Sequence, residues 1–228
     1  MKKIYKSIKN FLLKHPSIRN KVRSFRWRSK NIPLLGPVVA AFERGYFGSC
    51  AGERYDAINP TEANDYFESY APILVAKARG KVIDLGCGYG YLTERIAKSN
   101  NVSKVIGVDK IADFRCKHPK IEYVTQDLAV NNNLPKDVDT VVSSEFIEHL
   151  SEDDFRKLIP QIKLALKDDG VYIGSTPLNP TKKKNFSGSP FHIREYNQKD
   201  LENLFKEFFS EVEVNPISEF CLVWEVKK

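Results

Sequence analysis

The sequence predicts an α/β domain built on a parallel sheet. Short apolar runs recur from residue 82 onward and alternate with longer stretches that are polar or have helical periodicity, a pattern typical of strands joined by crossover helices. The runs are Val82–Leu85, Val105–Val108, Ile121–Val124, Val138–Val142 and Val171–Gly174. A glycine-rich segment directly after the first run agrees with this class, as does a length of 228 residues, which supports one substantial core.

A helix is predicted between the fourth and fifth of these runs. Ser151 is a preferred helix N-cap and Asp154 follows three residues later, which resembles a capping box. Apolar residues from Phe155 onward have helical spacing, and the helix is expected to end near Gly170. Pro160 lies inside this segment, so we expect a kink or a break there. The later elements are a helix, whose start is marked by Asn197 and Asp200, and two strands at Glu211–Val214 and Phe220–Val226.

The basic residues are concentrated in the first part of the chain. The net charge is +7, yet residues 1–42 carry eleven Lys and Arg and no acidic residue. The remainder carries 25 Lys and Arg against 29 Asp and Glu, so it is net acidic. We therefore interpret residues 1–44 as a basic N-terminal extension and residues 45–228 as the main domain. The positive charge of the whole chain does not indicate a nucleic-acid-binding surface on the domain itself.

The extension contains an amphipathic, helical and basic segment. Ile4, Ile8, Phe11 and Leu12 recur at helical spacing, with lysines displaced toward the other side. One interpretation is that residues 1–30 bind an anionic membrane surface, where each Lys or Arg contributes about 1 kcal/mol. An arm that binds RNA is a second interpretation, and a helix that packs on its own domain is a third. The apolar runs are too short for a secretory signal or a transmembrane segment.

The cysteines argue for a reducing compartment. Cys50, Cys87, Cys116 and Cys221 lie too far apart for a CxxC pair and are too few to staple a secreted scaffold of this length. We therefore expect a cytoplasmic protein. If the extension binds lipids, the protein is expected to be peripheral on the inner membrane face.

The most informative segment is the glycine-rich turn after the first apolar run. It reads Val-Ile-Asp-Leu-Gly-Cys-Gly-Tyr-Gly-Tyr over residues 82–91 and is expected to open a helix over Tyr91–Lys98. Glycines at positions 86, 88 and 90 allow the backbone to approach a ligand where a Cβ would collide. Asp84 places a carboxyl group just beneath the turn. The segment therefore predicts a nucleotide site at the end of the first strand.

Two further acidic residues end the next two predicted strands. Asp109 follows Gly86 by 23 residues, where an acid can accept hydrogen bonds from both hydroxyls of a ribose. Asp127 ends the third strand and can accept from an adenine amino group. NAD enzymes also combine a glycine turn with an acid after the second strand, but their turn is spaced G-x-G-x-x-G and this one is spaced G-x-G-x-G. Three strand ends thus point at one adenosine.

This set of residues resembles the class I S-adenosylmethionine-dependent methyltransferases over about residues 60–226. The resemblance implies a Rossmann-like, seven-stranded, mostly parallel sheet with helices on both faces and an antiparallel last strand between its neighbours. It also implies S-adenosylmethionine as the cofactor, with its methionine part at the glycine turn, its ribose at the second strand and its adenine at the third. The residues expected to bind it are Asp84, Gly86, Cys87, Gly88, Tyr91, Asp109, Lys110, Asp127, Leu128 and Ser144.

A candidate acceptor site follows the fourth predicted strand. Methyl transfer from a sulfonium is an in-line displacement, and an alcohol or phenol acceptor must also lose a proton. If the segment Ser143–Leu150 is helical, Glu145, Glu148 and His149 lie on one face at the carboxyl edge of the sheet. His192 follows the Ser-Thr-Pro that ends the fifth strand and is expected to fold over the same edge.

Two carboxylates and two imidazoles indicate a metal site, in which Glu145, Glu148, His149 and His192 bind Mg²⁺ or another divalent cation. The Glu-x-x-Glu-His segment resembles ubiquinone-pathway O-methyltransferases and enzymes that methylate the 2′-hydroxyl at the 3′ end of small RNAs, and the resemblance implies metal assistance. In a metal-free alternative, His149 is a general base or only orients the turn, and Glu145 is structural. The predicted catalytic residues are His149, Glu148 and His192.

The predicted function is O-methylation of a small-molecule, saccharide (glycan) or lipid-linked acceptor. An RNA end is the second acceptor class, because the domain without its extension is net acidic and repels a polyanion. A non-catalytic module that binds S-adenosylmethionine is the alternative from a different class. The stretch Gly45–Tyr70, which includes Tyr66, precedes the first strand where this family commonly places a lid over the donor.

Overall fold

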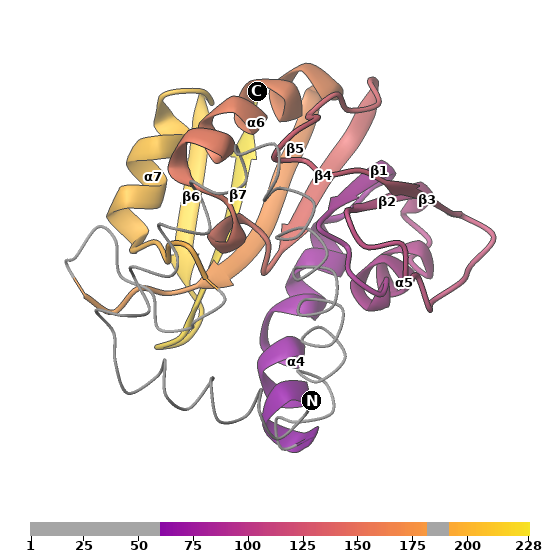
Figure 1. Cartoon of the computed structure of the whole chain (residues 1–228), viewed down its shortest axis with the longest axis horizontal. Helices are drawn as coiled ribbons and strands as arrows, with labels where there is room; N and C mark the ends of the chain where they lie inside the picture. The colour runs from indigo at the N-terminus through magenta and orange to yellow at the C-terminus, as the bar shows by residue number, and fades with distance from the viewer. Residues whose placement is uncertain (1–59, 182–191) are drawn as a thin grey trace, which may run out of the picture. The chain divides into compact units, whose positions relative to one another are not determined.

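A seven-stranded sheet forms the centre of the computed structural model, which describes residues 60–181 and 192–228 (Figure 1). The strand order is β3-β2-β1-β4-β5-β7-β6. β7 pairs antiparallel with both of its neighbours, and the other pairs are parallel. The strands are β1 (Gly80–Leu85), β2 (Val102–Asp109), β3 (Ile121–Thr125), β4 (Val138–Ser144), β5 (Leu166–Pro177), β6 (Glu211–Pro216) and β7 (Cys221–Lys227). This arrangement confirms the predicted fold class.

Helices cover both faces of the sheet. The helices are α4 (Pro60–Lys77), α5 (Tyr91–Ala97), α6 (Glu152–Ala165) and α7 (Gln198–Lys206), with a short 3₁₀ helix η1 (Ile147–His149). Apolar residues of α6 and α7 pack in one core with Tyr172 and Trp224 of the sheet, whereas those of α4 and α5 pack in a second core with Val82 and Val105. Figure 1 shows the two pairs of helices on opposite sides of the strands. Residues 61–228 form one compact unit.

Helix α6 begins where the sequence predicts and ends earlier. The Ser151 side chain accepts a hydrogen bond from the Asp154 N–H, which caps the helix. The helix ends at Ala165 and not near Gly170, because Leu166 is extended and already pairs with Val138 as the first residue of β5. The helix also continues through Pro160 without the predicted break. Its face is anchored by side chains on both sides of the proline that have no exposed surface, namely Phe155, Leu158, Ile159 and Ile162.

The shorter helices begin at the predicted positions. Asn197 caps α7 by accepting a hydrogen bond from the Asp200 N–H at 2.9 Å. Helix α5 begins at Tyr91, directly after Gly90 in the left-handed conformation (φ 92°), and ends one residue before Lys98. Each predicted strand coincides with an observed strand to within a few residues, apart from β5, which starts five residues before Val171.

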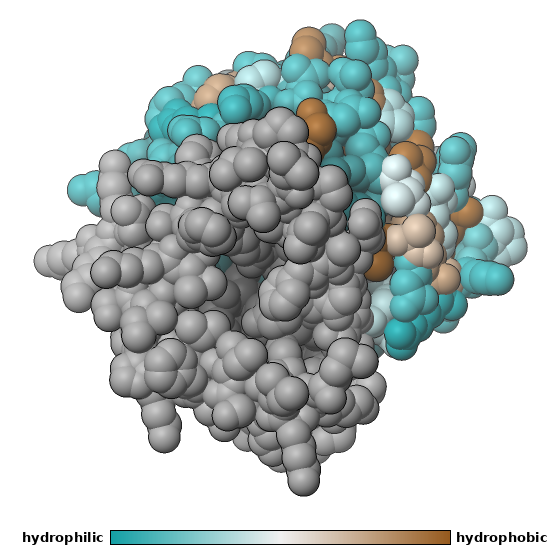
Figure 2. Space-filling model, viewed as in Figure 1, coloured by the Kyte–Doolittle hydropathy of each residue, from teal (hydrophilic) through white to brown (hydrophobic). Residues whose placement is uncertain are grey.

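The described surface in the view of Figure 2 is mainly hydrophilic, with scattered hydrophobic residues. Among the helices of the described residues, none combines the length and apolar character needed to cross a bilayer. The predicted basic extension, its boundary with the main domain and the first part of the predicted lid lie outside the described residues. The membrane and RNA interpretations of residues 1–30 therefore remain predictions.

Candidate active site

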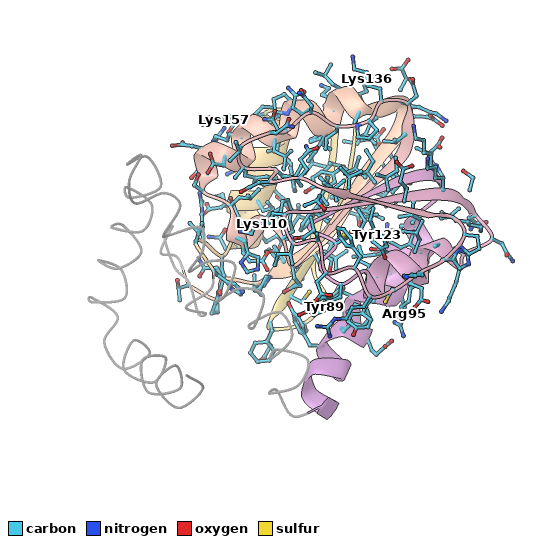
Figure 3. The ribbon with its side chains drawn as sticks, turned by 45° about the vertical axis from the view of Figure 1, so that its right-hand side comes forward. Tyr89, Arg95, Lys110, Tyr123, Lys136 and Lys157 are labelled. Carbon is cyan, nitrogen blue, oxygen red and sulfur yellow. The ribbon has the colours of Figure 1, made fainter. Side chains whose placement is uncertain are left out.

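The glycine turn joins β1 to α5 at the carboxyl edge of the sheet. The backbone N–H groups of Gly86 and Cys87 both donate to the carbonyl oxygen of Val108 on β2, at 2.8 and 3.2 Å. On its other side, the carbonyl oxygen of Tyr89 accepts from the N–H groups of Arg115 and Cys116 in the loop before β3, at 3.0 and 3.2 Å (Tyr89 is labelled in Figure 3). The turn is thus fixed by hydrogen bonds from two neighbouring segments.

The three glycines of the turn have different surroundings. All three have positive φ, which L side chains rarely adopt. A Cβ at Gly86 would overlap the ring of Phe146, and a Cβ at Gly90 would overlap the hydroxyl of Tyr123. A Cβ at Gly88 would meet no atom within 4 Å. The backbone of Gly88 therefore borders open space of the kind that a bound ligand fills.

Asp109 links the end of β2 to this turn. One of its carboxylate oxygens accepts from the N–H of Gly88 at 2.9 Å, and the other accepts from the N–H of Ile111 at 2.8 Å. Burial raises the pKa of Asp109, and these two backbone hydrogen bonds oppose that rise. Each carboxylate oxygen has a second acceptor position, so Asp109 can hold the turn and also bind both hydroxyls of a ribose.

Asp84 lies beneath the turn and is almost fully buried, with 1% of its surface exposed. Its carboxylate accepts a hydrogen bond from the Thr93 hydroxyl at 2.6 Å. Burial, and to a lesser extent the neighbouring Asp109, raise the pKa of Asp84 to about 7, whereas the Thr93 hydrogen bond lowers it. This carboxyl group therefore titrates near neutral pH.

The remaining predicted cofactor residues lie around the same edge in different settings. Asp127 is exposed just after β3 and accepts from the Ala129 N–H at 3.0 Å, whereas Leu128 is buried in the core. Lys110, labelled in Figure 3, is exposed directly after Asp109. Cys87 is half-buried, and burial raises the pKa of its thiol. Tyr91 is exposed at the first position of α5. The hydroxyl of Ser144 accepts a hydrogen bond from the hydroxyl of Ser175 at 3.2 Å.

The segment after β4 does not form the regular helix on which the predicted alignment of Glu145, Glu148 and His149 depends. Glu145 has a positive φ of 51°, and only residues 147–149 form a turn of 3₁₀ helix. The left-handed residue is held by a hydrogen bond from its N–H to the carbonyl oxygen of Ser175 on β5, at 3.0 Å. It also directs Phe146 into the space that the missing side chain of Gly86 leaves. This tertiary contact overrides the local helical spacing.

Glu145 consequently lies apart from the other predicted metal ligands. One of its carboxylate oxygens accepts from the hydroxyl of Tyr66 on α4 at 3.1 Å, and the other accepts from the hydroxyl of Ser175 at 3.2 Å. Burial and the nearby Glu145 carboxylate raise the pKa of Tyr66, so this residue stays a protonated donor. The predicted alignment of Glu145, Glu148 and His149 on one helical face is wrong.

Glu148, His149 and His192 do come together. One potential ligand atom from each of the three lies within 4.8 Å of the others. Glu148 has no exposed surface, and its Oε1 lies 3.7 Å from Nε2 of His149 and 4.0 Å from Nε2 of His192. Its other oxygen accepts from the hydroxyl of Thr176 at 3.0 Å. The two imidazole rings meet edge to face, with centroids 5.2 Å apart.

The backbone of Glu148 also positions the segment that carries His192. The carbonyl oxygen of Glu148 accepts from the N–H groups of Ile193 and Arg194, at 2.7 and 3.2 Å. His192 is 4% exposed, and its Nδ1 lies 2.6 Å from a carboxylate oxygen of Glu195, which is 5% exposed. Glu195 and Thr176 are site residues that the sequence reasoning did not assign. Glu195 stands three residues after His192, and that spacing was the signal available.

Comparisons with known proteins identify the family of this chain. A family model described as a methyltransferase domain matches residues 55–208, which is more than half of the chain. The chain belongs to the class I S-adenosylmethionine-dependent methyltransferases. A probable S-adenosylmethionine-dependent methyltransferase from Mycolicibacterium smegmatis is 30% identical over 162 residues, which are 67% of this chain and 62% of that protein. The chain thus spans less than two thirds of this relative's length.

Two further comparisons agree with the family. The ubiquinone biosynthesis O-methyltransferase of Actinobacillus pleuropneumoniae is 32% identical over 139 residues, or 55% of this chain and 56% of that protein. The solved structure of DhpI in complex with SAH superposes with a TM-score of 0.67 at 19% identity and covers 81% of this chain and 94% of DhpI. At that identity the likeness to DhpI is one of fold.

The candidate site therefore has two parts along one sheet edge. The glycine turn follows β1, with Asp84 in β1 and Asp109 at the end of β2, and the cluster of Glu148, His149 and His192 follows β4 and β5. Phe146 connects the two parts. Its ring lies against Gly86, and Phe146 itself precedes Glu148 by two residues. A methyl donor at the turn and a methyl acceptor at the cluster would lie along the same edge of the sheet.

Proposed function

We propose that this methyltransferase transfers the methyl group of S-adenosylmethionine to an oxygen atom of a small-molecule, saccharide or lipid-linked acceptor. The observation that carries the proposal is the cluster of Glu148, His149 and His192 next to the glycine turn. Such groups are needed when the acceptor must lose a proton. The name of the Actinobacillus relative, an O-methyltransferase, supports the same reaction type.

The donor side of the proposal rests on three features of the turn. The open space at Gly88 accommodates the methionine part, and the second acceptor positions of Asp109 bind the ribose. Asp84, when ionised, provides a buried negative charge that favours the ammonium group of the donor. The donor supplies a methyl group on a positively charged sulfur, so the protein's task is alignment and exclusion of water.

On the acceptor side, His149 is the residue that a substrate reaches. Its side chain is 30% exposed, whereas those of Glu148 and His192 are 0% and 5% exposed. In this proposal Nε2 of His149 accepts the proton of the acceptor hydroxyl. Glu148, with Oε1 3.7 Å from that nitrogen, stabilises the resulting imidazolium. Thr176 keeps the other oxygen of Glu148 in place.

The same three residues fit a divalent cation. Two imidazole nitrogens and one carboxylate oxygen form a donor set that suits Mn²⁺, Co²⁺ or Zn²⁺ better than it suits Mg²⁺, which prefers oxygen ligands alone. Their separations of up to 4.8 Å exceed the ~3 Å between adjacent ligands at bond lengths of about 2.1 Å, so the side chains would move inward slightly. A bound cation would lower the pKa of the acceptor hydroxyl.

Methyl transfer to a panel of phenols, saccharides and lipid-linked sugars, followed by mass spectrometry, tests the proposal on the full chain. We expect O-methylated product with at least one class, and a 10²-fold or greater loss of turnover in His149→Ala with S-adenosylmethionine affinity unchanged. Activity that disappears in chelator and returns with Mn²⁺ would assign the cluster to a metal. A chain that binds the donor but methylates only nitrogen or carbon acceptors would contradict the proposal.

The lipid-linked acceptor class depends on the basic segment 1–30. Co-sedimentation with phosphatidylglycerol vesicles, compared between the full chain and a variant with the lysines of residues 1–14 replaced by glutamine, tests this part. We expect the full chain to bind, with binding that weakens as salt rises, and the variant to bind less at every salt concentration. Equal binding of both proteins would remove the membrane from the proposal, and retention of RNA by the full chain alone would redirect it to an RNA acceptor.

A further inference from the structure

We infer that Glu195 is a positioning residue that fixes the tautomer and direction of the His192 ring. Its carboxylate holds Nδ1, so that Nε2 faces Glu148 and His149 with its lone pair. The inference rests on the proposed function in so far as it gives His192 a task in the acceptor site. The geometric claim about the ring stands independently of which acceptor or cation the site takes.

The contact between the two side chains is short and buried. Nδ1 of His192 lies 2.6 Å from Oε1 of Glu195, and the residues are 4% and 5% exposed. A buried carboxylate is strongly disfavoured unless it accepts hydrogen bonds, and Nδ1 of His192 lies at the distance of a hydrogen-bond donor to it. The proton of a neutral His192 therefore belongs on Nδ1, where the carboxylate stabilises it.

The backbone around Glu195 leaves this carboxylate little freedom. The carbonyl oxygen of Glu195 accepts from the side-chain amide of Asn179 at 3.4 Å, and the carbonyl of Tyr196 accepts from the Asn179 N–H at 2.8 Å. On the other side, Ile193 is tied to the Glu148 carbonyl. The segment is thus held both to Asn179, just after β5, and to Glu148 in η1.

The consequence appears at the other ring nitrogen. In the neutral ring with its proton on Nδ1, Nε2 of His192 carries a lone pair, and it lies 4.0 Å from Oε1 of Glu148. Nε2 of His149 lies 3.7 Å from the same oxygen. These atoms are too far apart for a direct hydrogen bond to one another, and together they would be the ligands of a bound cation. Glu195 thereby prepares His192 as a ligand and not as a hydrogen-bond donor.

Nitrogen-15 NMR of the imidazole rings of the full chain measures the tautomer directly. The chain has four histidines, and His192→Gln identifies the His192 signals by their loss. We expect the Nδ1–H tautomer in the wild type and in Glu195→Gln, whose amide oxygen still accepts, and a mixture or the Nε2–H form in Glu195→Ala. An Nε2–H tautomer in the wild type, or no change in Glu195→Ala, would overturn the inference.

Mn²⁺ affinity, measured from the EPR signal of free Mn²⁺, provides the second test. Removing a partner that orients a metal-bound histidine typically weakens the metal 10- to 100-fold. We expect about that loss in Glu195→Ala and a smaller one in Glu195→Gln, which keeps the acceptor but not the charge. Donor affinity should stay within twofold in both variants, and equal Mn²⁺ affinity in Glu195→Ala and the wild type would refute the positioning role.

Glu152→Gln is the matched control. Glu152 forms an ion pair with Arg194, so it supports the same segment without facing His192. Its substitution should leave both the tautomer and the Mn²⁺ affinity unchanged, and an equal effect in this variant would reduce Glu195 to general structural support. If the wild type binds no Mn²⁺, the metal in the proposed function fails, while the tautomer of His192 still decides the role of Glu195.

Discussion

The buried carboxyl group of Asp84 lowers the stability of the fold when it is ionised, and in the proposed function the same charge favours binding of the cationic methyl donor. A carboxyl group whose pKa is raised on folding stabilises the native state below its unfolded pKa, and that contribution is lost as pH rises through the folded pKa. For Asp84 the loss falls between pH about 4 and about 7. Above that range the site holds a buried carboxylate that the cationic donor can neutralise. The residue is thus tuned for binding near neutral pH.

Substitution of Asp84 by Asn tests this trade-off. The free energy of unfolding of the wild type should decrease between pH 4 and 7 relative to that of Asp84→Asn, and the variant should be more stable at pH 8 by roughly 2–4 kcal/mol. Its affinity for S-adenosylmethionine should nevertheless fall at least tenfold. Urea unfolding at several pH values and calorimetric titration measure the two effects, and parallel stability curves would show that Asp84 is not buried as a charge.

The elements of the site are shaped by contacts between strands as much as by local sequence. The turn after β4 has helical spacing, yet the Ser175 carbonyl and the gap at Gly86 select a left-handed Glu145. In this conformation the Glu145 side chain accepts a hydrogen bond from Tyr66, and the Glu148 side chain lies near His149 and His192. The conformation of this turn, and not the spacing of the motif, therefore determines which carboxylate lies near the two histidines.

The two carboxylates should accordingly respond differently to the same substitution. Glu148→Gln should lower turnover 10²-fold or more and abolish Mn²⁺ binding, because the residue faces both imidazoles. Glu145→Gln should leave Mn²⁺ affinity within threefold and cost about 1 kcal/mol of stability through its hydrogen bonds. Steady-state kinetics and EPR measure the contrast, and equal loss of Mn²⁺ in both variants would return Glu145 to the ligand set.

The glycine turn offers a second comparison at this scale. Gly88→Ala introduces no overlap and should cost only about 1 kcal/mol for its left-handed φ, but its methyl group enters the space assigned to the donor. Gly90→Ala meets the Tyr123 hydroxyl and should cost more stability. We expect Gly88→Ala to be the variant that folds well and binds S-adenosylhomocysteine poorly. If a stable Gly88→Ala variant binds S-adenosylhomocysteine as the wild type does, the donor does not bind at Gly88.

At the scale of the whole molecule, the sequence predicted what neighbouring residues determine and missed what the packed sheet determines. The strands, the caps at Ser151 and Asn197 and the acids at strand ends are visible locally. The end of α6 was missed because Leu166 pairs with Val138 across the sheet. The number of strands and the antiparallel last strand between its neighbours followed from the family resemblance and not from periodicity, which carries no information on strand neighbours.

The missed parts of the site have the same origin. The hydrogen bond between Tyr66 and Glu145 joins residues 79 positions apart, so no spacing rule reveals it. Thr176 reaches Glu148 only because β4 and β5 are adjacent. The glycine turn can be read from one stretch of sequence, whereas its hydrogen bonds to Val108 and Asp109 also depend on the neighbouring strand β2.

In the proposed function the methyl donor binds at the glycine turn with its ribose on Asp109. Calorimetric titration of S-adenosylhomocysteine into the wild type and into Asp109→Ala measures this contact. We predict one site per chain in the wild type and an affinity at least 100-fold lower in the variant, which loses the ribose contact and the anchor of Gly88. Absence of binding to the wild type, or equal affinity in both proteins, would contradict it.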